Sequence, residues 1–237
     1  MIVTLALLAG CRADDPMDAF QPGERGRVVR IIDGDALVLD TGQSVRLIGI
    51  EAPAKARRDR EAETFATESA RMLEDMALGR EVRLYYAGLT RDRYDRALAH
   101  VATIDDLGPP FWLNVEMAKR GGARVRLYPD TAIGSTPLIE AEAEAREAAS
   151  GLWGETRYKV LRASELPEDT ARFQIVTGII GKAREADDVA CKRPLLSSWL
   201  ALEIEPMAED ICALPEGTRV EARGYIWSGS MEITHAL

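Results

Sequence analysis

Charged side chains of the kinds that bind phosphate or a hard cation gather in the first half of the chain. They are Asp33-Gly34-Asp35, Arg46, Glu51 and Arg93-Tyr94-Asp95-Arg96. Carboxylate oxygens are ligands of Ca²⁺, and the donor fork of arginine binds phosphoryl oxygens bidentately. Taken singly, each stretch has an ordinary explanation, because Asp-Gly-Asp is a good turn and a lone arginine usually forms a surface salt bridge. Together they favour metal-assisted chemistry on a phosphate ester.

The order and spacing of these stretches resemble those of the thermonuclease, or staphylococcal-nuclease-like, family. That family carries an Asp-Gly-Asp turn, an Arg-Leu-x-x-x-acid-x-Pro strand end and a basic-Tyr-x-Arg element before a strand. Here the second motif is Arg46-Leu-Ile-Gly-Ile-Glu51-Ala-Pro53, and the match continues through Leu113-Asn114 to the closing Gly151-Leu-Trp153. The resemblance covers residues 27–155. It implies hydrolysis of phosphodiester bonds in DNA or RNA.

The resemblance also assigns a metal site. Asp35, Glu51 and the backbone carbonyl of Ala52 match the family's Ca²⁺ ligands, and Asp33 matches an outer-shell acid that orders metal-bound water. Glu51 stands where the best-known member has Asp, so Ca²⁺ is expected but the preferred ion is open.

Two arginines match the positions that stabilise charge developing on the phosphate. Arg46 and Arg96 are therefore the expected catalytic residues. Arg93 and Tyr94 match positions that contact a terminal phosphate or sugar. Tyr128 is expected to offer a stacking face to the substrate, with simple packing as the alternative.

The chain departs from the family pattern immediately after Pro53. The family has there a glutamate, usually assigned as the general base, and this chain has Ala54, which cannot accept a proton. General-base assistance is worth roughly 10²–10⁴-fold in rate, so slow hydrolysis and loss of catalysis are both compatible with the remaining set. Asp59, Glu61 or Glu63 could supply a base instead, but acids at a helix start are explained by the helix dipole, which we favour.

The whole protein is therefore expected to follow one of two hypotheses. The first is an envelope-anchored, Ca²⁺-assisted nuclease whose activity is weakened by Ala54. The second is a degenerate relative that binds a nucleotide, a phosphate or an envelope protein without turnover.

Alternating apolar residues predict the strands that position this chemistry. Strands are expected at residues 27–33, 35–40, 44–50, 81–86 and 97–104, and helices at residues 59–78, 114–120 and 136–150. This pattern describes a small closed β-barrel of the oligonucleotide-binding (OB) type with helices on its flank. The predicted fold class is mainly β with helices (α+β), with the nuclease-like domain over residues 25–158.

A second β-rich region follows a linker at residues 159–170. It spans residues 171–237 and loosely resembles the small OB-like barrel that follows the nuclease domain in some proteobacterial relatives. From Glu165 onward there are 13 acidic and 7 basic residues, which argues against nucleic-acid binding. We expect its large aromatic residues to pack in the barrel or against the first domain rather than form a stacking platform: Trp199, Tyr225 and Trp227.

The N-terminus predicts export and a lipid anchor. Residues 2–10 are apolar but too few to span a bilayer, which takes ~20 helical residues, and they suit a signal peptide. Leu8-Ala9-Gly10-Cys11 resembles a bacterial lipobox, which implies a signal peptide over residues 1–11, lipid on Cys11 and a periplasm-facing location at the outer membrane. A buried element that ends in cysteine is the alternative. Residues 12–24 are expected to form a flexible tether.

Once Cys11 is assigned to lipid, two cysteines remain, in the same C-terminal region. Cys191 and Cys212 are expected to form one disulfide in an oxidising compartment, with buried free thiols as the alternative. The histidines, His100 and His235, lack the spacing of a zinc site or a catalytic triad.

The chain as a whole is acidic, with 39 Asp and Glu against 30 Lys and Arg and a net charge of −9. Such a charge disfavours diffuse attraction to a polyanion, so a nucleic-acid substrate requires a local basic site. We expect a monomer.

Overall fold

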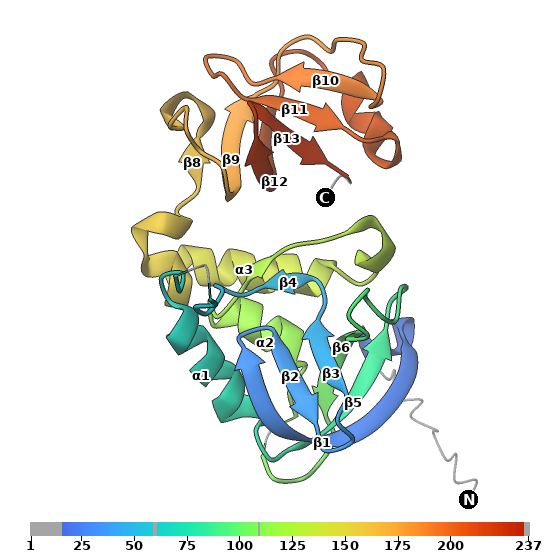
Figure 1. Cartoon of the computed structure of the whole chain (residues 1–237). Coiled ribbons are helices and arrows are strands. Elements are labelled where there is room, and N and C mark those ends of the chain that lie inside the picture. The colour runs from blue at the N-terminus through green and yellow to red at the C-terminus, as the bar shows by residue number, and fades with distance from the viewer. Residues whose placement is uncertain (1–15, 59–60, 109, 235–237) are drawn as a thin grey trace, which may run out of the picture.

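The computed structural model describes residues 16–58, 61–108 and 110–234, which form two β-rich units stacked end to end (Figure 1). Cys11, Asp59 and His235 lie outside the described residues. No helix among those described is long and apolar enough to cross a membrane.

Five strands of the first unit close into a barrel, as the sequence predicts. The order around the barrel is β1-β2-β3-β6-β5, and β3 and β6 run parallel. A separate two-stranded ladder, β4 with β7, lies outside the barrel. The strands are β1 (Gln21–Asp33), β2 (Ala36–Leu39), β3 (Ser44–Leu47), β4 (Ile50–Glu51), β5 (Glu81–Tyr86), β6 (Ala97–Thr103) and β7 (Arg124–Val125).

Three helices flank the barrel, which is the number expected. They are α1 (Ala66–Ala77), α2 (Leu113–Lys119) and α3 (Thr136–Glu147). Leu73 of α1, Met117 of α2 and Leu138 of α3 are buried in one hydrophobic core with the barrel strands. Burial of these apolar faces is the main force that holds the helices on the barrel. Short 3-10 turns complete the unit: η1 (Pro16–Ala19), η2 (Pro129–Thr131), η3 (Gly151–Gly154) and η4 (Thr156–Tyr158).

The first helix begins later than its apolar spacing predicts. Residues 61–65 are not helical, and Phe65 adopts a left-handed backbone with φ 70°. Two hydrogen bonds between Glu63 and Ala54 explain the delay. The Glu63 amide donates to the Ala54 carbonyl at 2.9 Å, and the Ala54 amide donates to Glu63 Oε2 at 2.8 Å. These bonds hold the segment against the site instead of releasing it into the helix.

The first strand begins earlier than predicted, inside the expected tether. Gln21 pairs with Tyr86 and Pro22 with Tyr85, so residues 21–24 belong to the barrel. Phe20, just before the strand, is buried against His100, with the ring centroids 4.4 Å apart. This aromatic contact draws the segment onto the barrel.

The second unit is a curled six-stranded sheet in the order β10-β11-β13-β12-β9-β8, in which β11 and β13 are parallel. The sequence predicts that this unit closes into a barrel. In the structure, isolated bridges make that closure: Ile180 with Leu195 and Arg184 with Lys192 join the chain that follows β9 to the region of β10. The elements are β8 (Leu161–Arg162), η5 (Ala163–Glu165), β9 (Phe173–Ile179), β10 (Cys191–Pro194), β11 (Ala201–Ile204), η6 (Pro206–Ala213), β12 (Arg219–Trp227) and β13 (Ser230–Ile233).

A disulfide joins two elements of the second unit. It links Cys191 on β10 to Cys212 in η6, with the Cα atoms 6.0 Å apart. It therefore fastens η6 to the sheet, at the side where the sheet is closed only by bridges.

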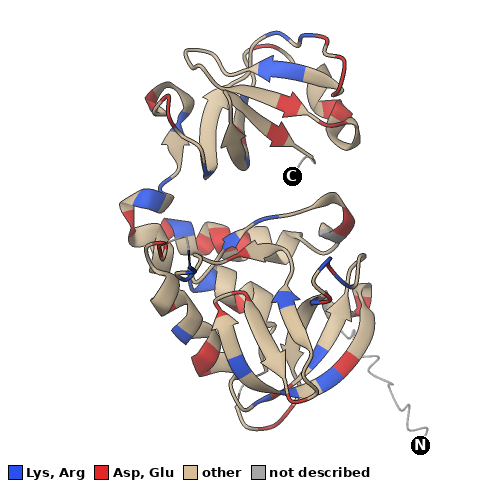
Figure 2. Ribbon diagram, in the orientation of Figure 1, with Lys and Arg blue, Asp and Glu red and all other residues tan. Residues whose placement is uncertain are grey.

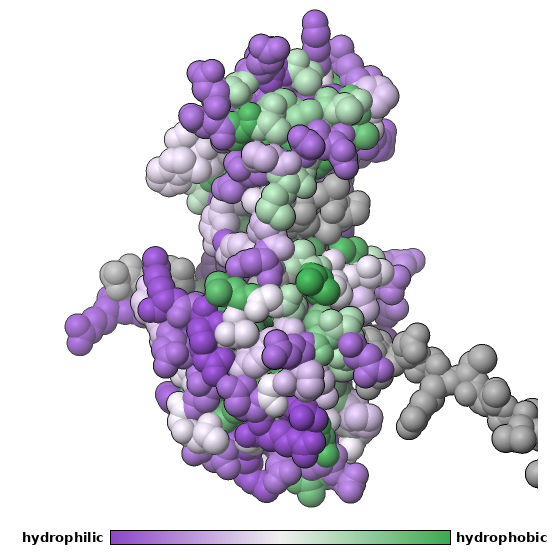
Figure 3. All heavy atoms as spheres, turned by 90° about the vertical axis from the view of Figure 1, so that its right-hand side faces the viewer, coloured by the Kyte–Doolittle hydropathy of each residue, from purple (hydrophilic) through white to green (hydrophobic). Residues whose placement is uncertain are grey.

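Ion pairs join the two units at α3 and β12. Arg223 Nη1 lies 2.7 Å from Glu142 Oε2, and Arg146 Nη2 lies 2.6 Å from Glu221 Oε2. Figure 2 shows both signs of charge on α3 and its surroundings. In Figure 3 the units form two lobes, and hydrophobic residues gather near the level where they meet. The junction thus combines apolar and charged contacts.

Candidate active site

The Asp33-Gly34-Asp35 turn joins β1 to β2 and is packed against α1. Asp33 is 9% exposed and Asp35 only 1%. A Cβ added at Gly34 would lie 1.8 Å from Ser69 Oγ, so the close approach of the turn to α1 requires glycine. The sequence motif is therefore a tight, buried turn that fixes two carboxylates at one end of the barrel.

Asp35 is held between β3 and the segment after β4. Arg46 Nη1 donates to Asp35 Oδ1 at 2.7 Å, and the Ala52 amide donates to Oδ2 at 2.7 Å. Burial raises the pKa of Asp35 to about 8, although Arg46 and the Ala52 amide act in the opposite direction. For Arg46, burial lowers the pKa, but the nearby carboxylates of Asp35, Asp33 and Glu51 outweigh it, so the net shift is upward. The arginine is therefore cationic and lies among all three predicted metal-site acids.

Glu51 is positioned by the small ladder outside the barrel. It lies opposite Arg124 in the pairing of β4 with β7. Its Oε1 atom is 3.1 Å from Arg126 Nη1 and accepts a hydrogen bond from the Tyr225 hydroxyl at 3.2 Å. Burial raises the pKa of Tyr225, and the charge of Glu51 adds to that rise. A residue of the second unit thus donates directly to a predicted metal ligand.

The acids of the site offer oxygen donors that partly fit a hard cation. Asp33 Oδ1 and Glu51 Oε2 are buried without a hydrogen-bond partner among the described residues, and such orphaned oxygens are suited to a cation. Both oxygens of Asp35, however, are already bonded. Across the described ranges, no group of three His, Cys, Asp or Glu residues converges on one point that could hold a metal. The donor chemistry fits Ca²⁺, whereas Asp35 would have to exchange a present partner to bind it.

The segment that contains Arg96, the second predicted catalytic arginine, lies beside the strand that contains Arg46. In the parallel ladder Arg46 pairs with Leu98, so Arg96 precedes that partner by two residues, on the same face. Arg96 is held by Asp92, with Nε to Oδ2 at 2.7 Å. Tyr94 is 67% exposed, and the Arg93 guanidinium lies 4.8 Å from its ring centre. The structure therefore places these residues at the rim of the site, and Arg96 is oriented by Asp92 rather than by the metal-site acids.

The position of the missing family glutamate is adjacent to another acid. Of the alternatives named from the sequence, Glu61 is exposed, whereas Glu63 accepts the Ala54 amide hydrogen bond at 2.8 Å. Glu63 Oε1 also lies 3.4 Å from Arg157 Nη2. An acid nine residues further along the chain, where the sequence predicts a helix start, therefore lies directly at the Ala54 position.

Sequence reasoning missed two arginines, Arg124 of β7 and Arg126 directly after that strand. Arg124 and Arg126 alternate around the buried Val125, so both can face Glu51 across the ladder. The Arg126 guanidinium lies 4.8 Å from the Tyr128 ring centre and 4.7 Å from that of Tyr225. The alternation Arg-Val-Arg-Leu-Tyr was a readable strand signal, but nothing in it named Glu51 as the partner.

His100 takes no part in this arrangement. It is fully buried in β6, and burial lowers its pKa to about 3. Its Nδ1 accepts a hydrogen bond from the Trp112 indole at 3.3 Å. It is a neutral core residue, as its strand position indicates.

Comparison with known proteins identifies relatives of the first unit. A family model described as staphylococcal nuclease homologue matches residues 44–155, which include Arg46, Glu51 and Arg96 and end before β8. A thermonuclease of Staphylococcus intermedius is 31% identical over 134 residues, covering 55% of this chain and 77% of that protein. An uncharacterized endonuclease of Escherichia coli is 32% identical over 134 residues, with the same two coverages. A probable endonuclease of Pyricularia oryzae is 35% identical over 121 residues, covering 46% of this chain and 43% of that protein.

Proposed function

Because the chain belongs to the family of staphylococcal nuclease homologues, we propose that it is a thermonuclease-type phosphodiesterase acting on DNA or RNA. The observation that carries the proposal is the position of Arg46, which is fixed by Asp35 at 2.7 Å among three carboxylates. A cation held in that way is preorganised to bind a phosphodiester, and it costs no reorganisation during the reaction.

Arg46 and Arg96 are proposed to bind the phosphate together. Arg46 is 26% exposed at its side chain and Arg96 is 31% exposed, so both are anchored yet accessible. Arg46 lies in β3 and Arg96 directly before the adjacent β6. The two guanidinium groups can bind phosphoryl oxygens and stabilise the charge that develops on the phosphate during nucleophilic attack. Arg93, Tyr94 and Tyr128 are proposed to contact the rest of the substrate, and the exposure of Tyr94 and Tyr128 supports this.

Calcium is the proposed metal, with Asp35, Glu51 and the Ala52 carbonyl as ligands and Asp33 in the outer shell. The support is chemical, since the acids are oxygen donors and two of their oxygens are orphaned. When bound, Ca²⁺ would polarise and neutralise the phosphate. Glu51 also has to be released from Tyr225 or share its Oε1 with it.

A second function is favoured by one observation, the alanine at position 54. Without a base the same arginines would bind a nucleotide, a phosphate or an envelope protein without turnover. The role of Glu63 distinguishes the active nuclease from the degenerate relative, because its carboxylate accepts the Ala54 amide hydrogen bond. If Glu63 acts as the general base, it replaces the family glutamate in catalysis. If Glu63 only accepts this hydrogen bond, the site has no base and is degenerate.

The test is digestion of single-stranded DNA by purified residues 12–237, with Ca²⁺ or with a chelator. We expect Ca²⁺-dependent cleavage that is lost in Arg46→Ala. Loss in Glu63→Gln, together with retention in Glu61→Gln, would assign the base to Glu63. An inert wild type that is activated by Ala54→Glu would instead support the degenerate relative. A rise in melting temperature with Ca²⁺ gives a readout of metal binding that does not need turnover.

Export and anchoring are proposed alongside the activity. The disulfide between Cys191 and Cys212 is consistent with an oxidising compartment, and the lipobox-like sequence ends at Cys11. We propose a lipid-anchored, periplasm-facing protein at the outer membrane. Mass spectrometry of the protein from the envelope fraction should find diacylglycerol on Cys11, and an unmodified Met1 in soluble lysate would contradict the anchor.

A further inference from the structure

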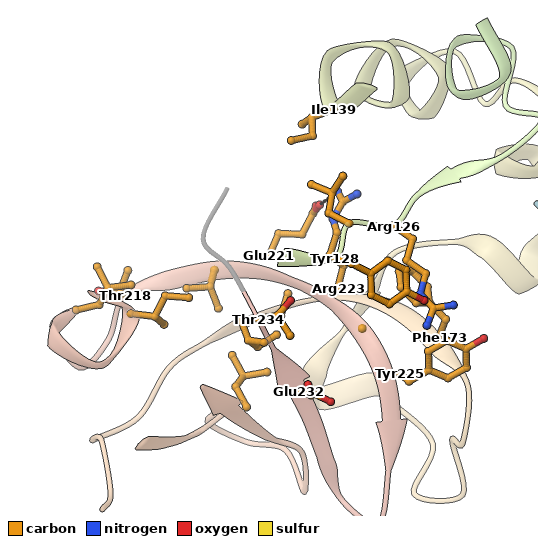
Figure 4. A pocket seen from close by; sticks show the side chains of 18 of the residues that line it. Arg126, Tyr128, Ile139, Phe173, Thr218, Glu221, Arg223, Tyr225, Glu232 and Thr234 are labelled. Carbon is orange, nitrogen blue, oxygen red and sulfur yellow. Dashed lines mark hydrogen bonds and ion pairs between the residues drawn. The ribbon is translucent and has the colours of Figure 1, made fainter. Parts of the chain in front are cut away.

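A cavity of about 640 Å³ opens between the two units, next to the candidate active site (Figure 4). Its volume lies within the usual range for small-ligand sites. One wall comes from residues 126–128, directly after β7, and from α3, and the other from β12, β13 and η6. Much of the lining is apolar, with Ile139, Leu214 and Val220 among its residues. The cavity therefore exists only because the second unit is docked on the first.

Aromatic and cationic side chains gather at one end of this cavity. Figure 4 shows Arg126, Tyr128 and Tyr225 close together there. The Arg126 guanidinium lies less than 5 Å from both tyrosine ring centres, at 4.8 and 4.7 Å. Tyr128 is 47% exposed and Tyr225 48% exposed, so each ring keeps an open portion. We name these three residues the aromatic clamp.

The clamp is directly connected to the proposed metal site. Glu51 Oε1 is bound both by Arg126 and by the Tyr225 hydroxyl. A substrate phosphate placed at Arg46 and Glu51 would therefore carry its neighbouring nucleoside towards the cavity.

We propose that Tyr225 of the C-terminal unit adds a second ring to the stacking face expected at Tyr128, so that the aromatic clamp binds one unpaired nucleobase of a single-stranded substrate. This inference rests on the proposed function. At the clamp a base fits better than a phosphate, because Arg126, the cation of the clamp, is paired with Glu51. Exposed aromatic rings bind bases of any sequence by stacking. A base inside a duplex is not available to such a subsite unless it leaves the stack.

The stacking partner can be tested by binding without turnover. The probe is a fluorescently labelled thymidine octanucleotide, measured by anisotropy in chelator with residues 12–237. Tyr225→Ala should weaken binding by about 5- to 100-fold. Tyr225→Phe keeps the ring and loses only the hydroxyl contact to Glu51, so it should stay within about threefold of wild type. The matched control is Trp227→Ala, because Trp227 is on the same strand, is 74% exposed and does not line the cavity.

An abasic octanucleotide of the same length separates base stacking from backbone attraction. It should bind the wild type more weakly, by about the same factor, and should not respond to Tyr225→Ala. Equal binding of abasic and normal strands would overturn the proposal, as would equal losses in Tyr225→Ala and Trp227→Ala or no binding by wild type. Thermal melts verify that each variant is folded. Cleavage with Ca²⁺ is scored separately, so an inert protein that still discriminates abasic strands would refute the hydrolase but retain the subsite.

Discussion

The two units of this chain share one topology, but among the residues that the structure describes, the cluster of acids and arginines that suits phosphate chemistry lies in the first unit. The first barrel runs β1-β2-β3-β6-β5, with α1 between β3 and β5. The second sheet runs β9-β10-β11-β13-β12 once the bridges from the end of β9 to β10 are included, with η6 between β11 and β12. In each, the third and fourth strands of this order are parallel, β3 with β6 and β11 with β13. Because both units have this strand order, it does not explain why the candidate active site lies in the first unit.

Corresponding positions in the two units hold opposite chemistry. Arg46 is the penultimate residue of β3 and pairs with Ala36, which follows Asp35. The penultimate residue of β11 is Glu203, which pairs with Lys192, and Lys192 follows Cys191. Where the first unit has a buried acid, the second has a disulfide. The same backbone thus holds a buried acid bonded to an arginine in one unit and a surface salt bridge with a covalent link in the other, as expected when function resides in side chains grafted on a fold.

The largest expected effect concerns the contact that holds the units together. Glu142 is 1% exposed and takes charge-assisted bonds from Arg223. Arg223→Ala removes the nearest cation from that buried carboxylate and leaves it the Val125 amide and Arg146, whose Nη1 lies 3.9 Å away. We therefore expect a loss of about 3 kcal/mol in unfolding free energy, the lower end for breaking a buried pair. Chemical denaturation measures it. Arg219→Ala, an exposed arginine of the same strand, is the control. The double variant Glu142→Leu with Arg223→Leu should recover much of the loss, and no recovery would contradict the ion-pair explanation.

The second prediction tests whether the site belongs to the first unit alone. Arg46→Ala should lower kcat/KM for single-stranded DNA by about 10²–10³-fold, which is the usual loss for one preorganised donor. Arg46→Lys keeps a charge near Asp35 but not the fork, so it should remain well below wild type. Glu203→Ala, at the corresponding place in the second unit, should leave kcat/KM unchanged. A comparable loss of kcat/KM in Glu203→Ala would contradict the assignment of the site to the first unit.

The third prediction concerns the disulfide of the second unit. Cys191 and Cys212 are separated by 21 residues, and a disulfide closing a loop of that size typically contributes about 3 kcal/mol. Cys191→Ser with Cys212→Ser should lower the unfolding free energy by about that amount. Hydrogen exchange should show loss of protection in β10 and η6, with the first barrel protected as before. Uniform loss across both units would show that they unfold as one.

The first unit was also the more predictable from sequence. Its apolar alternation gave five strands because Leu37, Leu39, Val45 and Leu47 face one core. β10 gives no strand signal in the sequence, because its residues, Cys-Lys-Arg-Pro, interrupt any apolar alternation, and Arg193 is buried where it donates to the carbonyls of Gly181 and Leu214. A buried arginine that satisfies loop carbonyls leaves no periodic signal.

The site was predicted in its parts but not in its connections. The resemblance assigned Asp35 and Arg46 to one site, but nothing in the sequence predicted that Arg46 donates to Asp35. The contact from Tyr225 to Glu51 spans 174 residues and depends on how the units dock. No local pattern encodes such a contact. The delay of α1 was likewise missed, since it arises from the bonds between Glu63 and Ala54 rather than from helix propensity.

The smallest expected effect is at the counterpart of the Asp35–Arg46 pair. Lys192 Nζ lies 2.6 Å from Glu203 Oε1, but the side chains are 45% and 27% exposed, so solvent screens the pair. Lys192→Gln should cost only about 0.2–1 kcal/mol at neutral pH. The bond from Lys192 lowers the pKa of Glu203 below its ordinary value of 4.5, with a smaller effect from Ser230. A lowered pKa gives stability that is present above 4.5 and is lost as the pH falls through the folded-state value. The difference between wild type and Lys192→Gln, followed by denaturation from pH 7 to pH 3, should therefore shrink towards zero in acid, and a difference that grew on acidification would show that Glu203 is not stabilised as a carboxylate.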